Sequence, residues 1–307
     1  MKRTRALPIL PLCFLLLLLY FANGQAAPTS NLRIAYINVG QGDAALIRDS
    51  SGFDILIDGG KTSAGPVVVA YLRGQGIDDV DVMVASHADS DHIGGLIDVL
   101  ETADIPVEAV LYNGYPGSTD TWNNFVTAVT NEGLSLTTLQ YPSTSTWGET
   151  TAHILNPVAG LVNPETNDVS VVIMLEHGDN HFLFTGDIDS GVEGEILEHG
   201  EPVAADVLKV AHHGSQYSSS EAFLLAVLPD NAVISVGDNP YGHPADETLA
   251  RLAAVGAHIW RTDLDGTIVV DSDGFSYSIY SEYRRFRLYL PLVTSNLQAA
   301  TTTENVK

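Results

Sequence analysis

The feature that most restricts how this chain can fold is a layout that recurs along it: a short apolar run that ends directly in histidine or aspartate beside glycine. The layout occurs in DVMVASHADSDHIGG (81–95), HFLFTGD (181–187) and DVLKVAHHGS (206–215). Short apolar runs bounded by turn residues are typical of buried strands. In open α/β sheets, ligands bind beyond the carboxyl ends of the strands. We therefore expect an α/β fold that brings these three segments to one shared site.

The segment SHADSDHIGG (86–95) predicts a metal site rather than an ordinary polar loop. His87, Asp89 and Asp91 alternate, so in an extended backbone they would point to the same side. His92 would turn to a neighbouring position, and the glycines at 94–95 would permit a sharp turn into a helix. The alternative is a solvated loop with a helix-capping aspartate. The spacing favours ligands to two metal ions, because a polar loop has no need of it after an apolar strand.

Other residues of the ligand type follow predicted strands in the same way. Half of the ten histidines fall in three short motifs of this kind, namely His87, His92, His212, His213 and His243. A lone histidine is usually a surface or core residue, but a set beside aspartate and glycine indicates a site. A carboxylate such as Asp187, directly after an apolar strand and a glycine, suits a ligand that bridges two cations.

Residues 31–281 indicate a single domain. Strand-like runs at 32–39, 44–49 and 53–58 begin it, and a second hairpin joins VSVVIML (169–175) to HFLFTGD. Helical and strand-like segments then alternate. This order predicts an α/β sandwich of two mixed sheets with helices outside. The domain shows no internal linker and no repeat of fixed period.

The two ends of the chain differ from this domain. Residues 1–26 combine a basic start, an apolar run and small residues, which is typical of a cleaved signal peptide, with a retained membrane anchor as the alternative. Cys13 is the only cysteine, so the mature chain would have no thiol or disulfide. Residues 282–307 predict a partly disordered tail whose apolar part is too short to span a bilayer. We expect a secreted or periplasmic protein without a stable membrane span after cleavage.

The charge of the chain bears on its partners. It carries 38 acidic and 14 basic residues, a formal net charge of -24. This is the wrong sign for a protein that holds nucleic acid by charge alone. Bound divalent ions would create a local positive site inside such an acidic protein. No protein partner can be inferred from the sequence.

Taken in order, the motifs resemble a known family. The resemblance is carried by INVGQGDAALI (37–47), ILIDGG (55–60), SHADSDHIGG (86–95), NDVSVVIML (167–175), LFTGDI (183–188), DVLKVAHHGS (206–215), SVGDNPYGHP (235–244) and WRTDLDGTI (260–268). From Leu32 to Tyr280, the chain is similar to the metallo-β-lactamase fold and, within it, to the metallohydrolase domain of the ComEC/Rec2 DNA-uptake proteins. The resemblance implies an αβ/βα sandwich and two bound divalent metal ions.

The resemblance also implies the metal ligands. They are His87, Asp89, Asp91, His92, Asp187 and His213. His87 and Asp89 would hold one ion, and Asp91 and His92 would hold the other. Asp187 would bridge the ions and His213 would complete the second site. His212 would contact the substrate or exchange roles with His213, and the sequence leaves both assignments open.

Further residues would support the site. Asp58 would be a structural carboxylate that fixes the loop ahead of the metal motif. Gln41 and Asp43 lie on a GQGD turn that approaches the metal edge in such domains. His243 would reach the site from YGHP to contact a substrate phosphate or to donate a proton.

The sequence departs from the general superfamily pattern at the first metal. Asp89 replaces the second histidine of the usual His-x-His-x-Asp-His motif. Asn167 or Asp168 stands where the fold usually supplies another histidine. Both changes exchange nitrogen for oxygen, and oxygen-rich sites suit Mn²⁺ better than imidazole-rich sites do. We therefore expect Mn²⁺ or Zn²⁺, with the first site weak for zinc.

The sequence thus predicts an exported metal-dependent hydrolase, a phosphodiesterase or nuclease that acts on DNA or a smaller phosphodiester. A hydroxide shared by two divalent ions would attack the phosphorus, and the catalytic residues would be Asp91, His212 and His243. One alternative is a lactam or lactone hydrolase, which the loss of a histidine-rich first site argues against. Another is a non-catalytic DNA- or surface-binding module, which the intact ligand set argues against.

Overall fold

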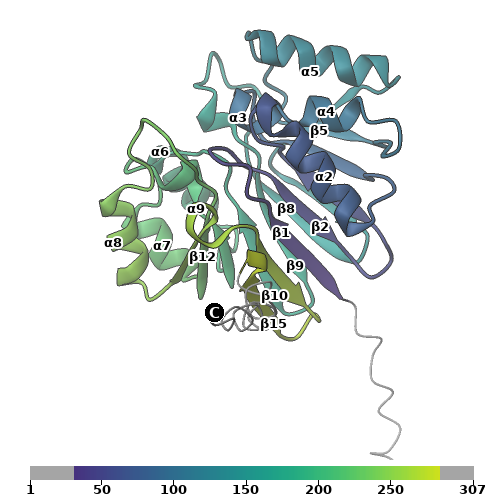
Figure 1. Cartoon of the computed structure of the whole chain (residues 1–307). Coiled ribbons are helices and arrows are strands. Elements are labelled where there is room, and N and C mark those ends of the chain that lie inside the picture. The colour runs from purple at the N-terminus through teal and green to yellow at the C-terminus, as the bar shows by residue number, and fades with distance from the viewer. Residues whose placement is uncertain (1–30, 284–307) are drawn as a thin grey trace, which may run out of the picture.

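The computed structural model describes residues 31–283. The predicted signal peptide (1–26) and the predicted tail beyond residue 283 lie outside the described residues. The described chain forms four layers, in which two sheets pack face to face and each carries helices on its outer face (Figure 1). The prediction of an α/β sandwich of two mixed sheets with flanking helices is confirmed.

The first sheet has eight strands in the order β15-β14-β1-β2-β3-β4-β5-β6. Their bounds are β1 (Leu32–Tyr36), β2 (Ala45–Arg48), β3 (Asp54–Ile57), β4 (Val82–Ala85), β5 (Val110–Tyr112), β6 (Leu136–Thr138), β14 (Ile268–Ser272) and β15 (Tyr277–Ser281). Strands β1 to β3 form an antiparallel meander, and β4 to β6 continue it in parallel. Strand β14 pairs antiparallel with β1, so the C-terminal part of the domain closes the N-terminal sheet.

The second sheet has seven strands in the order β13-β12-β11-β10-β9-β8-β7. Their bounds are β7 (Ser143–Trp147), β8 (Thr150–Asn156), β9 (Val172–His177), β10 (Asn180–Phe184), β11 (Val207–Lys209), β12 (Asn231–Ile234) and β13 (His258–Arg261). Strands β7 to β10 are antiparallel, and β10 to β13 are parallel. The predicted hairpin across EHGDN is therefore confirmed as β9–β10.

The helices divide between the two outer faces (Figure 1). Their bounds are α2 (Gly65–Gln75), α3 (Ser90–Ile93), α4 (Leu96–Leu100), α5 (Asp120–Asn131), α6 (Ser190–His199), α7 (Glu221–Val227), α8 (Asp246–Ala254) and α9 (Thr262–Asp265), with short 3-10 turns η1 (Thr62–Ala64), η2 (Asn167–Val169) and η3 (Ala211–Gly214). Residues of α2, α4 and α5 share an apolar cluster with the first sheet, and residues of α6, α7 and α8 share another with the second sheet. A third cluster lies between the sheets, so strands such as β4 are buried on both faces.

Two elements carry little signal in the sequence. Strand β7 is rich in serine and threonine and lies at the edge of its sheet, so it lacks the apolar alternation that predicts a strand. Helix α5 begins at Asp120, inside the polar stretch YNGYPGSTDTWNN (112–124). The Thr119 hydroxyl accepts the backbone N–H of Trp122 at 3.1 Å, and this N-cap starts the helix early. Within residues 31–283, no helix is long and apolar enough to cross a membrane.

Candidate metal centre

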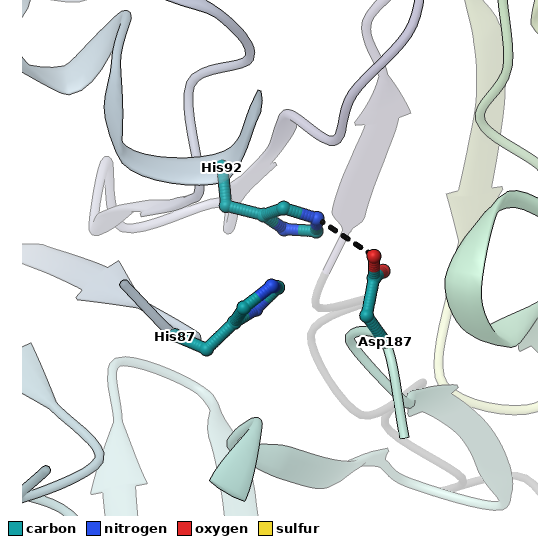
Figure 2. Close-up of side chains that lie close together, drawn as sticks. All are labelled: His87, His92 and Asp187. Atoms are coloured by element: carbon teal, nitrogen blue, oxygen red, sulfur yellow. Dashed lines mark ion pairs between the residues drawn. The ribbon is translucent and has the colours of Figure 1, made fainter. Parts of the chain in front are cut away.

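The ends of three neighbouring segments meet where the two sheets face each other. His87 and His92 follow β4, Asp187 follows β10, and His213 follows β11. Figure 2 shows the side chains of His87, His92 and Asp187 pointing toward one another. The Nε2 atom of His92 lies 3.3 Å from Asp187 Oδ2, and His213 Nε2 lies 3.3 Å from the same oxygen. The structure thus brings together residues that are far apart in the sequence.

The imidazole nitrogens at the centre of this cluster lack hydrogen bonds. The Nε2 atoms of His87, His92 and His213 are buried and have no hydrogen-bond partner within the described chain, and neither does Asp187 Oδ1. A buried polar atom without a partner is costly and calls for an explanation, such as an ion. Two overlapping groups have ligand atoms within 4.8 Å of one another, His87/His92/Asp187 and Asp91/His92/His213. Imidazole and carboxylate donors at this spacing fit divalent metal ions.

The opposite nitrogen of each ring is held by the protein. His87 Nδ1 lies 3.0 Å from the Ser86 hydroxyl, and His213 Nδ1 lies 2.9 Å from the Ser235 carbonyl oxygen. His92 Nδ1 lies 2.8 Å from Asp58 Oδ2. Such contacts fix the ring orientation and leave Nε2 free for a metal.

Asp58 also holds the strand end that carries the histidines. Its carboxylate accepts the backbone N–H of Ser86 at 2.8 Å and the Ser86 hydroxyl at 2.6 Å. The side chain is buried, and it contacts the His92 ring on the side away from Asp187. Asp58 thus links the end of β4 to the His92 ring.

The charged groups of the cluster shift one another's pKa values. Burial opposes the charged form of His92, but Asp187, Asp58 and Asp43 outweigh it and raise the pKa of His92 well above its usual value. Burial likewise opposes ionisation of Asp187, but His213 and His92 hold its pKa well below the usual range. A metal that binds here must therefore displace protons from the imidazoles. Burial, with the neighbouring His92, lowers the pKa of His87 to about 3, so this ring is neutral.

The segment 86–95 does not have the single extended backbone that the sequence predicted for His87, Asp89 and Asp91. Asp89 is the extended residue before α3, and Asp91 lies in the first turn of that helix, so the three alternating residues do not share one extended segment. Asp91 Oδ2 instead reaches within 3.6 Å of His213 Nε2 from the helix. Asp89 Oδ2 lies 3.8 Å from His87 Nε2, and its side chain is partly exposed.

The glycines at 94–95 are needed for close packing and not for a turn. Both have helical backbone angles, contrary to the expectation. A Cβ atom on Gly95 would overlap the carbonyl oxygen of Gly59, and one on Gly94 would overlap the backbone nitrogen of Thr62. The 59–62 segment therefore lies directly against α3 and α4, where it supports His92.

His212 and His213 occupy distinct places. Both have left-handed backbone angles, with φ values of 49° and 54°, so the chain turns sharply between the two rings. His213 is buried within the cluster, whereas His212 is partly exposed, with Nε2 3.9 Å from Asp187 Oδ2. Of the two assignments left open by the sequence, the geometry favours His213 in the cluster and His212 in the pocket wall.

Of the remaining candidate site residues, Gln41 and Asn167 lie near the cluster of metal-ligand side chains, whereas Asp168 does not. Gln41 lines the pocket, and its Oε1 accepts the Gly237 N–H at 3.3 Å. Asn167 has a buried Oδ1 without a hydrogen-bond partner in the described residues, and its carbonyl accepts the hydroxyl of Ser170, which lies 3.3 Å from His87 Nδ1. Asp168 has acidic neighbours instead, including Asp189, and no contact links it to the cluster within residues 31–283.

Lys209 is a site residue that the sequence analysis missed. Its buried ammonium contacts the Asp43 carboxylate, donates to the Gly186 carbonyl at 3.0 Å and lies 3.8 Å from Asp187 Oδ1. Asp43 also lies 3.4 Å from His213 Nδ1. A lysine inside the apolar run DVLKV was the available signal, since a buried lysine is almost always paired.

A pocket of about 700 Å³ opens beside the cluster. His212 and His243 form part of its wall, and their rings are 5.4 Å apart. Tyr217 and Tyr241 are each 70% exposed at its border. The described residues that line it include no lysine or arginine. A ligand here would meet aromatic, imidazole and carboxylate groups.

Comparison with known proteins agrees with this arrangement. Residues 37–238 match the Metallo-beta-lactamase superfamily. ComE operon protein 3 of Bacillus subtilis is 28% identical over 88% of this chain and 36% of its own length. Competence protein ComA of Neisseria gonorrhoeae is 32% identical over 80% of this chain and 33% of its own. The chain thus spans about a third of the length of these relatives.

Solved structures share the fold at low sequence identity. The metallo-beta-lactamase fold protein YhfI from Bacillus subtilis has a TM-score of 0.53 at 11% identity, covering 79% of this chain and 100% of that chain. A mutant of CmlA beta-hydroxylase has a TM-score of 0.51 at 13% identity, covering 81% of this chain and 54% of that chain. On the match over residues 37–238 and on this shared fold, the chain belongs to the metallo-β-lactamase superfamily.

Proposed function

We propose that the protein is an exported metal-dependent phosphodiesterase that acts on a small phosphodiester or on DNA. The observation that carries the proposal is the set of buried Nε2 atoms that have no hydrogen bond in the described chain and gather around Asp187, which borders an open pocket. Proteins of this superfamily usually hold a dinuclear metal centre, and the His/Asp clusters are present here. Two divalent ions would supply Lewis acidity and activate water near neutral pH.

The chain's own residues would divide the work as follows. His87, His92 and His213 would hold the metals through Nε2, together with Asp187, which lies 3.3 Å from the last two nitrogens, and Asp91, which lies 3.6 Å from His213. Asp89 would complete the site from the pocket side, where its carboxylate is partly exposed.

The two pocket histidines are suited to contact the phosphate. His212 lies close enough to Asp187 to position a phosphate oxygen beside the metal ligands. His243 has a buried Nδ1 atom without a hydrogen-bond partner in the described structure. Burial and the neighbouring His212 lower the pKa of His243 and favour its neutral ring, so we assign it to donate a hydrogen bond to a phosphate oxygen of the substrate.

The pocket also limits the substrate. Without lysine or arginine in the described lining, a polyanion gains little attraction beyond that of the metals. Tyr217 and Tyr241 offer exposed rings on which a base can stack. These features favour a nucleotide ester or a single strand over a duplex.

A comparison of substrates and metals tests the proposal. Purified protein loaded with Mn²⁺ or Zn²⁺ is expected to hydrolyse a nucleotide diester and single-stranded DNA faster than duplex DNA, and EDTA is expected to stop it. The lactam nitrocefin serves as the contrasting substrate. Faster turnover of the lactam would support the alternative hydrolase. Metal binding without turnover of any substrate would support a non-catalytic binding module.

A further inference from the structure

A second group of ligand-type side chains lies at the other end of β3 from the metal centre. Asp54 is the first residue of β3, whereas Asp58 follows its last residue and contacts His92. At about 3.3 Å per residue, the two positions are roughly 13 Å apart along the strand. Asp78 and Asp79 approach Asp54 from the loop between α2 and β4.

Three carboxylates converge at this point. Asp54, Asp78 and Asp79 each offer one oxygen, and these oxygens lie within 4.8 Å of one another. Asp81 adds a fourth carboxylate, whose Oδ2 accepts the backbone N–H of Asp54 at 2.6 Å. Asp78 is exposed and Asp79 is half-buried, so water can complete the coordination of an ion.

Asp54 distinguishes this group from an ordinary acidic surface. Its side chain is 0% exposed, and neither carboxylate oxygen accepts a hydrogen bond from the described residues. The neighbouring cation is Arg48, whose Nε is 3.3 Å from Asp54 Oδ1. The Arg48 guanidinium also donates to the carbonyl of Gln75 at 3.1 Å, so its charge is shared.

The positive charge of Arg48 does not neutralise the four carboxylates of this group. Burial, opposed by Arg48 and assisted by Asp81, Asp79 and Asp78, raises the pKa of Asp54 to about 7. A buried carboxylate that accepts no hydrogen bond is expensive, and a bound cation would help to keep it ionised. Neither oxygen of Asp54 accepts a hydrogen bond from the described residues, and one of them lies within 4.8 Å of an oxygen of Asp78 and an oxygen of Asp79.

We propose that Asp54, Asp78 and Asp79 bind a hard divalent cation, Ca²⁺, at a site separate from the metal centre. The donors are all carboxylate oxygens, which suit Ca²⁺ or Mg²⁺ and do not favour Zn²⁺. Their placement on a strand start and a loop suits the flexible coordination of Ca²⁺ better than the strict octahedron of Mg²⁺. The ion would tie the loop before β4 to β3 and stabilise the fold.

Calcium titration of the protein with its metal centre already loaded with Mn²⁺ tests this site. We expect saturable binding in isothermal titration calorimetry and a rise in Tm of about 5 °C when Ca²⁺ exceeds its Kd by roughly a hundredfold. The double variant Asp78→Asn/Asp79→Asn is expected to lose both. The control Glu101→Gln/Glu132→Gln removes the same charge from exposed positions and should keep both.

Each outcome decides the proposal. Absence of saturable Ca²⁺ binding by the parent, or equal binding by Asp78→Asn/Asp79→Asn, would overturn it. In EDTA the double variant should be as stable as the parent, because it loses only mutually repelling charges, so unfolding would not explain lost binding. Asp54→Asn, which keeps the side-chain shape, should lose the Ca²⁺ response as well. Hydrolytic activity of the double variant should match that of the parent.

Discussion

The buried charges around Asp187 depend on one another at the scale of single residues. Lys209 and Asp43 are both buried and form an ion pair beside the metal ligands. Burial opposes the charge of Lys209, but Asp43 and Asp187 outweigh it and raise the pKa of the lysine. The pair therefore stays charged, and removal of one partner deprives the other of its nearest opposite charge.

Lys209→Met is expected to lower the free energy of unfolding by about 3 to 5 kcal/mol, because the buried Asp43 carboxylate would lose its nearest cation. Urea denaturation in EDTA measures this loss. Asp43→Asn added to the same chain should recover part of it. A double variant no more stable than the single variant would contradict the assignment.

His212 and His213 are adjacent but should respond differently to truncation. His213→Ala removes a buried ligand-type nitrogen, so bound metal measured by mass spectrometry should fall along with activity. His212→Ala should keep the metal and lose about tenfold to a hundredfold in kcat, the value of one hydrogen bond to a charged group. Loss of metal in His212→Ala with full retention in His213→Ala would reverse the assignment.

His177 provides a pH-dependent test away from the metal centre. Its Nδ1 lies 2.8 Å from the Ser272 hydroxyl, and burial lowers its pKa below the usual 6.5. Because folding favours the neutral ring, its contribution to stability is complete above pH 6.5 and is lost as the pH falls through the lowered pKa. The stability lost in His177→Gln should therefore be larger at pH 8 than at pH 5. Equal losses in chemical denaturation at both pH values would contradict this.

At the scale of elements, the position of His92 depends on the contact between α3–α4 and the 59–62 segment. Gly95→Ala would overlap the Gly59 carbonyl, so it should cost about 1 to 3 kcal/mol of stability and weaken metal binding. Gly74→Ala is the matched control, since nothing lies within 4 Å of the added methyl group. In helix α2 it should stabilise the fold by about 0.5 to 1 kcal/mol. Thermal unfolding and metal content distinguish the two, and equal effects would refute the packing argument.

The elements also mark what sequence patterns can predict. Apolar runs such as those of β4 and β10 predict buried strands. The histidines and aspartates that follow these runs predicted that the segments meet at one shared site. The polar strand β7 carries no such signal, because it lies at a sheet edge. The choice between His212 and His213 depends on a turn with left-handed backbone angles at both residues, which spacing alone does not specify. Lys209 joins the site through its contact with Asp43, which is visible only in three dimensions.

At the scale of the whole molecule, the acidic chain must attract any phosphate substrate through a local feature. The formal net charge is -24, and the described pocket lining offers no lysine or arginine. The fold gathers imidazole and carboxylate groups at the edge where its two sheets meet, and metals bound there would supply the positive charge. Removal of the metals should therefore abolish both substrate attraction and chemistry.

The most direct measurement is the rate of bis-p-nitrophenyl phosphate hydrolysis by metal-depleted protein during titration with Mn²⁺. The proposed function predicts a rate that rises from near zero and saturates as metal is added. Asp187→Asn, which keeps the shape of the side chain, should show no such rise when it is assayed at a temperature at which circular dichroism shows it to be folded. A rate independent of added metal, or a variant that matches the parent, would contradict the assignment of this cluster as a metal-dependent phosphodiesterase centre.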